Sequence, residues 1–176
     1  MMNKKDFSIV CIGAGNVATH LAQALQQKGF HLSQIYSRTQ ESAQALAQTL
    51  GCAWTTCLEQ VDEHADLYIV SVKDAVLETV ISQLPHCNPD ALYLHTAGSM
   101  PMEVWKGKFK NYGVAYPMQT FSKQREVNFE EVPFFLEANS PENLSLLQEI
   151  AGSLSPKVYE ASSEQRKSVS YTHLRA

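Results

Sequence analysis

The stretch Phe7 to Ala18, FSIVCIGAGNVA, indicates the fold because an apolar strand runs directly into a glycine-rich turn. Residues 7–12 form a nearly continuous apolar run, which is typical of a parallel strand covered on both faces. The following turn, GAGNVA, has the G-x-G-x-x-A pattern of dinucleotide-binding sites. Gly13 permits a tight reversal, Gly15 leaves room for a pyrophosphate, and Ala18 lets the next helix pack close to the strand.

The helix after this turn provides the expected phosphate site at its first residues. Free N–H groups and the helix dipole favour negative charge there, so we expect the backbone around Gly13, Gly15, Asn16 and Val17 to bind the cofactor. A glycine-rich strand-to-helix turn also occurs in α/β proteins that bind no nucleotide. The strand before the turn and the amphipathic helix after it favour the nucleotide site; the apolar and small residues at helical spacing are Val17, Ala18, Leu21, Ala22, Ala24 and Leu25.

The tripeptide Ser37-Arg38-Thr39 follows the second predicted strand, 31–36, and bears on the choice of cofactor. An NAD site usually has Asp or Glu here, which accepts a hydrogen bond from the ribose 2′-hydroxyl, and neither is present. The Arg38 guanidinium can bind the 2′-phosphate of NADP and stack on adenine, and Ser37 and Thr39 can add hydrogen bonds. We therefore predict NADP as cofactor. The alternative is that Arg38 is a solvated residue before the next helix.

Strands and helices alternate along the chain, which predicts an α/β fold with a doubly wound, mainly parallel sheet. Ligands of such sheets bind beyond the carboxyl ends of the strands. Further strands are expected at 52–54, 65–72, 91–95, 112–116, 132–137 and 157–159, and helices or helical turns at 42–50, 58–63, 75–84, 102–105 and 141–154.

Three loops at the carboxyl edge carry the remaining candidate residues. In loop 95–99, His95 is a candidate proton donor to a substrate carbonyl or imine, or else it caps backbone groups. Thr96 of the same loop is a candidate cofactor contact. Lys73 could contact the cofactor ribose or a phosphate, or could be solvated. Candidate substrate contacts are Ser99 and Gln119, although Gln119 could instead satisfy loop carbonyls.

Composition excludes several classes of protein. The chain has 176 residues, of which 44% are hydrophobic and 18% charged, with a net charge of −4, as in an ordinary single domain. This mild acidity argues against a nucleic-acid partner, and the absence of an apolar span or signal sequence predicts a cytoplasmic protein without a membrane partner. The four cysteines and six histidines have no metal-ligand spacing, so we expect reduced thiols and no metal.

The segments GAGNVATHLAQAL, YSRT, ADLYIVSVKD, HTAGSMPMEV, YPMQTFSK and VPFFLEA, in this order, resemble a bacterial family of NADP-type oxidoreductases. Its members join an N-terminal Rossmann-like domain to an all-helical C-terminal domain of unknown function. The family is related to pyrroline-5-carboxylate reductase, deazaflavin-dependent NADP reductases and 6-phosphogluconate-type dehydrogenases. The resemblance covers about Phe7 to Lys167 and leaves the substrate open. It implies cofactor contacts at Gly13, Gly15, Asn16, Val17, Ser37, Arg38 and Thr39, with Val72, Lys73 and the loop 95–99 facing the nicotinamide.

The same resemblance implies a domain boundary near residue 160. Residues 1–160 would form the Rossmann-like NADP-binding domain, and 161–176 would begin the helix that leads to the helical domain. After SSEQRKS the chain continues VSYTHLRA, which resembles a translated sequencing-library adapter. We therefore expect that Val169–Ala176 are not part of the natural protein and that residues after Lys167 pack against nothing; a genuine short tail is the alternative. The parent protein is expected to form a homodimer through the helical domain.

The leading functional hypothesis is an NADP-dependent oxidoreductase that moves hydride between the nicotinamide and a small carbonyl, imine or hydroxy compound. On this hypothesis the full-length parent is the enzyme, and the fragment binds cofactor with little or no turnover. The alternative is a non-catalytic NADP(H)-binding sensor that regulates a partner, because no catalytic constellation of Lys, Tyr or Asp is evident. An FAD or S-adenosylmethionine site is disfavoured by the missing acid after the second strand.

Overall fold

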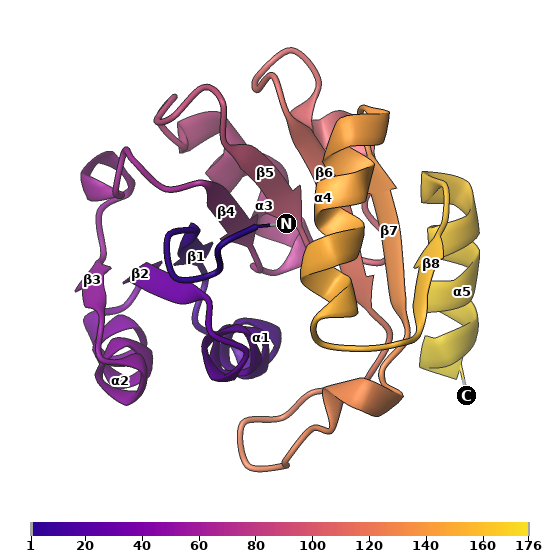
Figure 1. The fold of residues 1–176 in the computed structure, drawn as a ribbon, viewed down its shortest axis with the longest axis horizontal. Coiled ribbons are helices and arrows are strands. Elements are labelled where there is room, and N and C mark those ends of the chain that lie inside the picture. The colour runs from indigo at the N-terminus through magenta and orange to yellow at the C-terminus, as the bar shows by residue number, and fades with distance from the viewer. Residues whose placement is uncertain (1, 176) are drawn as a thin grey trace.

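In the computed structural model, which describes residues 2–175, the predicted strands pair into one eight-stranded sheet (Figure 1). The strand order is β3-β2-β1-β4-β5-β6-β7-β8. The α/β prediction is therefore confirmed. The strands are β1 (Ser8–Ile12), β2 (His31–Tyr36), β3 (Ala53–Thr55), β4 (Leu67–Val70), β5 (Leu92–His95), β6 (Tyr112–Pro117), β7 (Phe134–Ala138) and β8 (Val158–Glu160).

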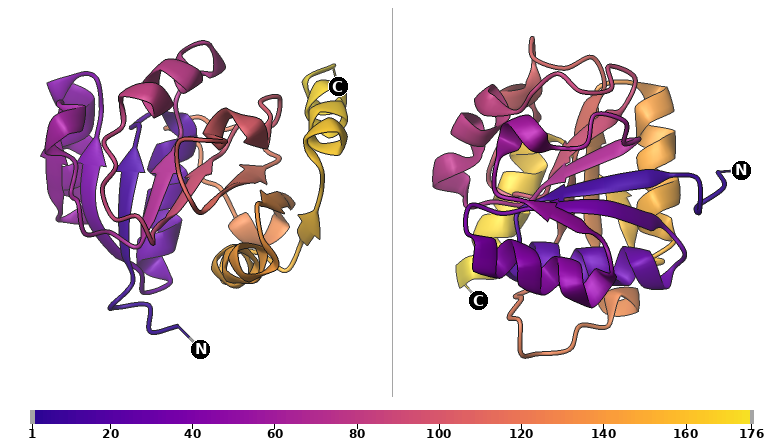
Figure 2. Two further views of the ribbon diagram at one scale, coloured as in Figure 1. Left: turned by 90° about the horizontal axis from the view of Figure 1, so that it is seen from above. Right: turned by 90° about the vertical axis from the view of Figure 1, so that its left-hand side faces the viewer.

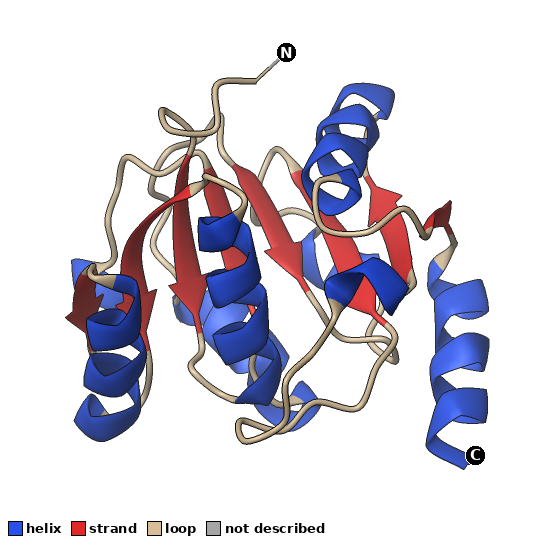
Figure 3. Cartoon of the chain, turned by 60° about the horizontal axis from the view of Figure 1, so that its bottom comes forward, coloured by secondary structure: helices blue, strands red, loops and turns tan. Residues whose placement is uncertain are grey.

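The strand order creates a crevice at the carboxyl ends of β1 and β4. From β1 the chain proceeds outward through β2 and β3 and then returns to place β4 on the other side of β1. Strands β1 to β6 are parallel, so their carboxyl ends meet at one edge of the sheet (Figure 3). Such a reversal of strand order is where ligands of doubly wound sheets bind.

Strand β7 runs antiparallel to β6, which makes the sheet mainly parallel, as predicted. The connection between them contains only a 3₁₀ turn, Phe129–Glu131, and no crossover helix. An antiparallel neighbour needs no such helix. Because of the 3₁₀ turn, the strand expected at 132–137 begins at Phe134 instead.

Helices cover both faces of the sheet (Figure 2). Along β1, Ile9 and Cys11 belong to one apolar cluster, and Val10 and Ile12 to the other. This alternation is the period of a strand buried on both sides. The helices are α1 (Asn16–Gln27), α2 (Gln40–Leu50) and α4 (Pro141–Gly152), which contribute to the first cluster, α3 (Asp74–Gln83), which contributes to the second, and α5 (Ser163–Arg175).

Two expected elements are shorter than predicted. The strand expected at 65–72 is reduced to Leu67–Val70, although Asp66 and Ser71 at its ends still bond to Ser8 and Ile12 of β1. The helix expected at 58–63 is a single 3₁₀ turn, Leu58–Gln60. This turn lies within the longer connection 56–66 between β3 and β4.

Helix α5 lies beside β8 at one end of the sheet (Figure 3). Our expectation that residues after Lys167 pack against nothing is wrong, because Ser170 is only 6% exposed. A Cβ at Gly98 would lie 2.7 Å from the Ser170 Oγ. The domain boundary near residue 160 and the origin of Val169–Ala176 stay predictions.

Within residues 2–175, no helix combines the length and the apolar character needed to cross a membrane. The cytoplasmic location stays a prediction.

Candidate functional site

Gly13 occupies a position that accepts only glycine. Its φ is +120°, and a Cβ there would lie 2.2 Å from the backbone oxygen of Ser71, which follows β4. Its N–H donates to the Tyr36 carbonyl at 2.8 Å. The turn is therefore held between the ends of β2 and β4, as the tight reversal predicted from the sequence requires.

Gly15 faces open space at the start of α1. A Cβ built on Gly15 would meet no protein atom within 4 Å, so the absence of a side chain is not a packing requirement here. No side chain caps α1, and its first turn has no acidic residue. The first N–H groups of a helix have no partner within the helix. This end of α1, with Asn16 and Val17, therefore fits a pyrophosphate, whose oxygens would accept those N–H groups.

The other helices of residues 2–175 begin differently. Each has an acidic residue in its first turn, which complements the helix dipole from within the protein. These residues are Glu41 in α2, Asp74 in α3, Glu142 in α4 and Glu164 in α5. In α1 the corresponding negative charge is left for a ligand to supply.

The end of β2 presents one free cation. Ser37 is 9% exposed and its N–H donates to the Thr55 carbonyl, whereas Arg38 and Thr39 are exposed. Within the described part of the chain, Arg38 has no hydrogen bond or ion pair. Its guanidinium is therefore available to an anion outside the protein, such as a ribose 2′-phosphate.

The ends of β4 and β5 meet next to the glycine turn. The Thr96 hydroxyl donates to the Ser71 Oγ at 3.0 Å, and a Val72 methyl group would lie 3.5 Å from a Cβ on Gly13. The structure thus brings Val72 and Thr96 together with Gly13, where a nicotinamide would follow the pyrophosphate. Lys73 is exposed at the start of α3. Ser71, which the sequence analysis did not select, could have been found as a polar residue directly after a buried strand.

The two candidate substrate residues lie on different loops. The Ser99 hydroxyl donates to the Asp74 Oδ2 at 2.5 Å, which joins the loop after β5 to the first turn of α3. Gln119 is exposed on the loop after β6, and its backbone N–H donates to the Pro117 carbonyl. Ser99 thus has a charged partner that orients its hydroxyl, and both substrate contacts stay predictions.

His95 is fully buried, and both of its ring nitrogens have backbone partners. Nδ1 accepts from the Ala97 N–H at 3.1 Å, and in this tautomer Nε2 donates to the Pro101 carbonyl at 3.2 Å. The ring stacks on Trp105. Burial lowers the pKa of His95 from 6.5 to about 4, and the nearby Arg166 charge acts in the same direction. This neutral imidazole holds the loop 95–101 in place; its role as a proton donor stays a prediction.

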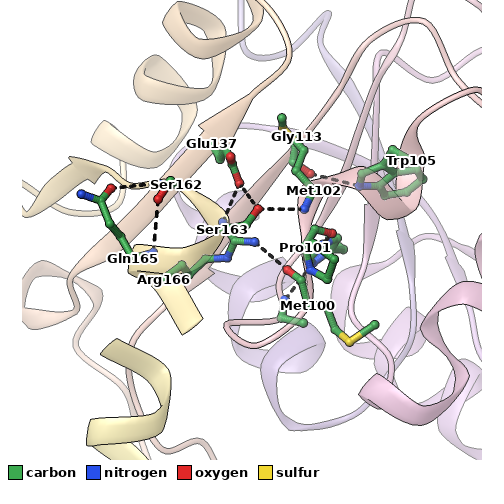
Figure 4. A network of polar contacts seen from close by, with 12 residues as sticks. Met100, Pro101, Met102, Trp105, Gly113, Glu137, Ser162, Ser163, Gln165 and Arg166 are labelled. Carbon is green, nitrogen blue, oxygen red and sulfur yellow. Dashed lines mark hydrogen bonds and ion pairs between the residues drawn. The ribbon is translucent and has the colours of Figure 1, made fainter. Parts of the chain in front are cut away.

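A buried ionic network at the start of α5 was not expected from the sequence (Figure 4). Arg166 is fully buried, and its guanidinium donates from Nη1 to Glu137 Oε1 at 2.9 Å and from Nη2 to the Met100 carbonyl at 2.6 Å. The Ser163 hydroxyl donates to the same Glu137 oxygen at 2.7 Å. No periodic apolar face marks this part of α5, so the sequence carried no signal that Arg166 is inside.

Cysteines and possible metal ligands add no further site. Among the described residues, no group of three His, Cys, Asp or Glu side chains is placed to hold a metal ion. All four cysteines are free thiols. Burial raises the pKa of the Cys11 thiol to about 12, so Cys11 is not a nucleophile.

The chain is similar in sequence to one described protein family. The sequence model of the family described as NADP oxidoreductase, coenzyme F420-dependent, matches residues 8–97, from β1 to the loop after β5. A comparison with curated proteins found no match.

Several solved structures share the fold. A candidate NADP oxidoreductase from Bacteroides fragilis is 53% identical, with a TM-score of 0.94, and the match covers 98% of this chain and 67% of that one. Prephenate dehydrogenase from A. aeolicus, solved with NAD+, is 14% identical with a TM-score of 0.77, over 91% and 61% of the two chains. Pyrroline-5-carboxylate reductase from Coxiella burnetii is 21% identical with a TM-score of 0.70, over 92% and 60%. The chain thus spans about two thirds of the length of these proteins or somewhat less.

Proposed function

Because this chain belongs to the NADP oxidoreductase family described as coenzyme F420-dependent, we propose that it forms the NADP-binding part of a hydride-transferring oxidoreductase. The observation that carries the proposal is the start of α1. Gly13 is confined there by the Ser71 carbonyl, while Gly15 faces open space before an uncapped helix. An anion-binding helix end beside a reversal of strand order is the arrangement of dinucleotide sites.

Arg38 is the reason to propose NADP rather than NAD. The end of β2 has no acid to accept a ribose 2′-hydroxyl, and Arg38 is exposed without a partner among the described residues. A hydrogen bond to a charged group contributes about 1.5–3 kcal/mol, so one such contact with the 2′-phosphate favours NADP by tenfold or more. Ser37 and Thr39 add two hydroxyls next to it.

The residues at the nicotinamide end would position the reacting groups. NADPH, when bound, supplies the hydride. Val72 and Thr96 would contact the nicotinamide side of the cofactor, next to the glycine turn. Ser99, whose hydroxyl proton is donated to Asp74, would accept a hydrogen bond from a hydroxy compound or a protonated imine. In this arrangement His95 would order the loop 95–101, because both of its nitrogens bond to backbone groups, and direct proton donation to the substrate stays the alternative.

The sensor alternative has no observation in its favour, since the matching family and the B. fragilis structure are named as oxidoreductases. Catalysis by the full-length parent and its homodimerisation through a helical domain stay predictions.

Titration of the chain with NADPH and NADH tests the choice of cofactor. We expect NADPH to bind at least about tenfold more tightly, because the 2′-phosphate gains at least one charged hydrogen bond to Arg38. Arg38→Ala should reduce this difference, because only NADPH has the 2′-phosphate. Arg125→Ala, which removes another exposed arginine, serves as the matched control. Equal affinities for both cofactors in the unmutated protein would contradict the assignment.

A second variant, at Gly15, tests the pyrophosphate site without disturbing the fold. Gly15→Val should lower the affinities for NADPH and NADH by the same factor, because the valine side chain would occupy the space where the pyrophosphate of either cofactor approaches. Unfolding by urea should remain cooperative, since no protein atom is displaced. Unchanged cofactor affinity in this variant would remove the proposed pyrophosphate site.

A further inference from the structure

Arg166 lies outside the predicted cofactor site, yet it joins α5 to a loop of that site. Its guanidinium bridges Glu137 on β7 and the Met100 carbonyl (Figure 4). The side chain is fully buried, and its Nε has no hydrogen-bond partner among the described residues. Glu137 and Met100 are therefore the two groups that hold this cation, one by charge and one by its dipole.

A second set of hydrogen bonds, made by Ser163, joins α5 to β7 and to the segment after Met100. The Ser163 hydroxyl donates to Glu137 Oε1 and accepts from the Met102 N–H at 3.1 Å. Helix α5 is thus attached to the segment 100–102 at two points. Both attachments share the Glu137 carboxylate.

The loop 97–101 connects this attachment to the glycine turn. Its ends are tied to His95, which accepts from the Ala97 N–H and donates to the Pro101 carbonyl. The neighbouring Thr96 hydroxyl donates to Ser71, whose carbonyl oxygen confines Gly13. A continuous series of contacts therefore runs from α5 to the predicted nicotinamide end.

We propose that Arg166 is a positioning residue that holds the loop 97–101 in its cofactor-binding conformation and thereby couples α5 to the nicotinamide half of the site. Without Arg166, the Met100 carbonyl loses its partner and the loop samples other conformations. Binding must then order the loop, and that entropic cost lowers affinity. This inference rests on the proposed function, because it takes the nicotinamide to lie beside Thr96.

Two ligands distinguish the two halves of the site. NADPH reaches both the glycine turn and the loop, whereas 2′-phospho-ADP-ribose has the pyrophosphate and 2′-phosphate but no nicotinamide. We expect Arg166→Met to lower the affinity for NADPH by about fivefold or more. Fivefold is the lower end of typical coupling between sites. The affinity for 2′-phospho-ADP-ribose should change less than about twofold, within the scatter of independent sites.

The outcomes separate a positioning role from a purely structural one. Equal weakening of both ligands would mean that Arg166 only stabilises the fold, and no change in either would mean that the loop does not depend on it. Either result overturns the inference. If the unmutated protein binds neither ligand, the proposed function fails instead. Lys110→Met is the matched control, because Lys110 is exposed and its ion pair with Asp90 includes no residue of this network.

A milder variant covers the case in which Arg166→Met does not fold. Ser163→Ala removes the second set of hydrogen bonds but keeps the Arg166–Glu137 pair, and Ser168→Ala is its control on an exposed face of α5. Amide hydrogen exchange in the segment 97–102 should be faster in Ser163→Ala than in the control, and exchange in β4 should be unchanged. The affinity for NADPH should again fall more than the affinity for 2′-phospho-ADP-ribose. Unchanged exchange in the loop contradicts the proposal.

Discussion

At the scale of single residues, burial decides what each charged side chain can do. Arg38 is exposed and unpaired among the described residues, so a ligand phosphate can reach it. Arg166 is fully buried and donates hydrogen bonds to Glu137 and Met100, so it acts inside the protein. His95 is likewise committed to backbone groups. The same residue type is thus accessible to a ligand in one place and part of the internal structure in another.

The burial of His95 makes the stability of the protein depend on pH. Its folded pKa of about 4 lies below the ordinary 6.5, so the unfolded state binds the proton first as the pH falls. His95 therefore destabilises the folded state progressively between about pH 6.5 and pH 4, by about 3 kcal/mol in total. Urea unfolding measured at intervals from pH 7.5 to pH 4.5 should show this loss.

Replacing His95 identifies its share of that dependence. His95→Gln has no group that titrates in this window, so its stability should fall less steeply with acid than that of the unmutated protein. His64→Gln, at an exposed position, should keep the original slope. If His95→Gln and the unmutated protein lose stability in parallel, His95 is not the buried neutral group described above.

At the scale of elements, the helix starts differ according to what satisfies their N–H groups. Helix α4 has Pro141 in its first turn and the Ser140 hydroxyl as a cap, which accepts from the Asn143 N–H at 3.1 Å. Helices α2 and α3 have no side-chain cap but have Glu41 and Asp74 in their first turns, whereas α1, after Gly15, has neither a cap nor an acidic residue. The protein completes the start of α4 by itself and leaves the start of α1 incomplete, as a ligand-binding helix end requires.

Removing the cap of α4 should therefore cost stability without affecting the cofactor site. We expect Ser140→Ala to lower the free energy of unfolding by about 1 kcal/mol, the usual value of a serine cap. Ser145→Ala, at an exposed position within the same helix, should change stability little or increase it slightly, because alanine is the better helix former. Chemical denaturation of both variants measures this difference. A Ser140→Ala protein as stable as the unmutated protein would mean that the Asn143 N–H donates to water instead.

At the scale of the whole molecule, one sheet joins two apolar clusters. Leu25 and Leu147 belong to one cluster and Tyr68 and Trp105 to the other, while the eight strands run between them without interruption. Adjacent residues of β1 point into opposite clusters. Neither cluster can lose its packing while the sheet remains intact, so the two should unfold together.

The two tryptophans test this cooperativity. Trp105 is fully buried in the cluster beside α3, and Trp54 is 37% exposed on the edge strand β3. The fluorescence of Trp54→Phe reports Trp105, and the fluorescence of Trp105→Phe reports Trp54. During unfolding in urea, the fluorescence of each variant should follow its own far-UV circular dichroism. Separate midpoints within one variant would show that the β3 edge unfolds independently of the rest.

The sequence by itself determined the α/β class, the mainly parallel sheet and the glycine turn, because these depend on local patterns. An apolar run, a small residue at a fixed spacing and a glycine at a sharp reversal act within a few residues of one another. The pattern of Ser37-Arg38-Thr39 belongs to the same class, since the end of a strand places its side chains at the ligand edge. Helix boundaries were shifted by one or two residues because capping and fraying are settled by neighbouring groups.

Only the tertiary structure decided which polar groups are buried and what they bond to. Arg166 contacts Met100, which is 66 residues away, and Glu137, which is 29 residues away, and no local pattern encodes either distance. The partners of His95 are close in sequence, but its complete burial, with the ring stacked on Trp105, belongs to the folded protein. Burial is a property of the assembled surfaces, so the charge state of a histidine and the place of an arginine follow from the fold and not from the residue.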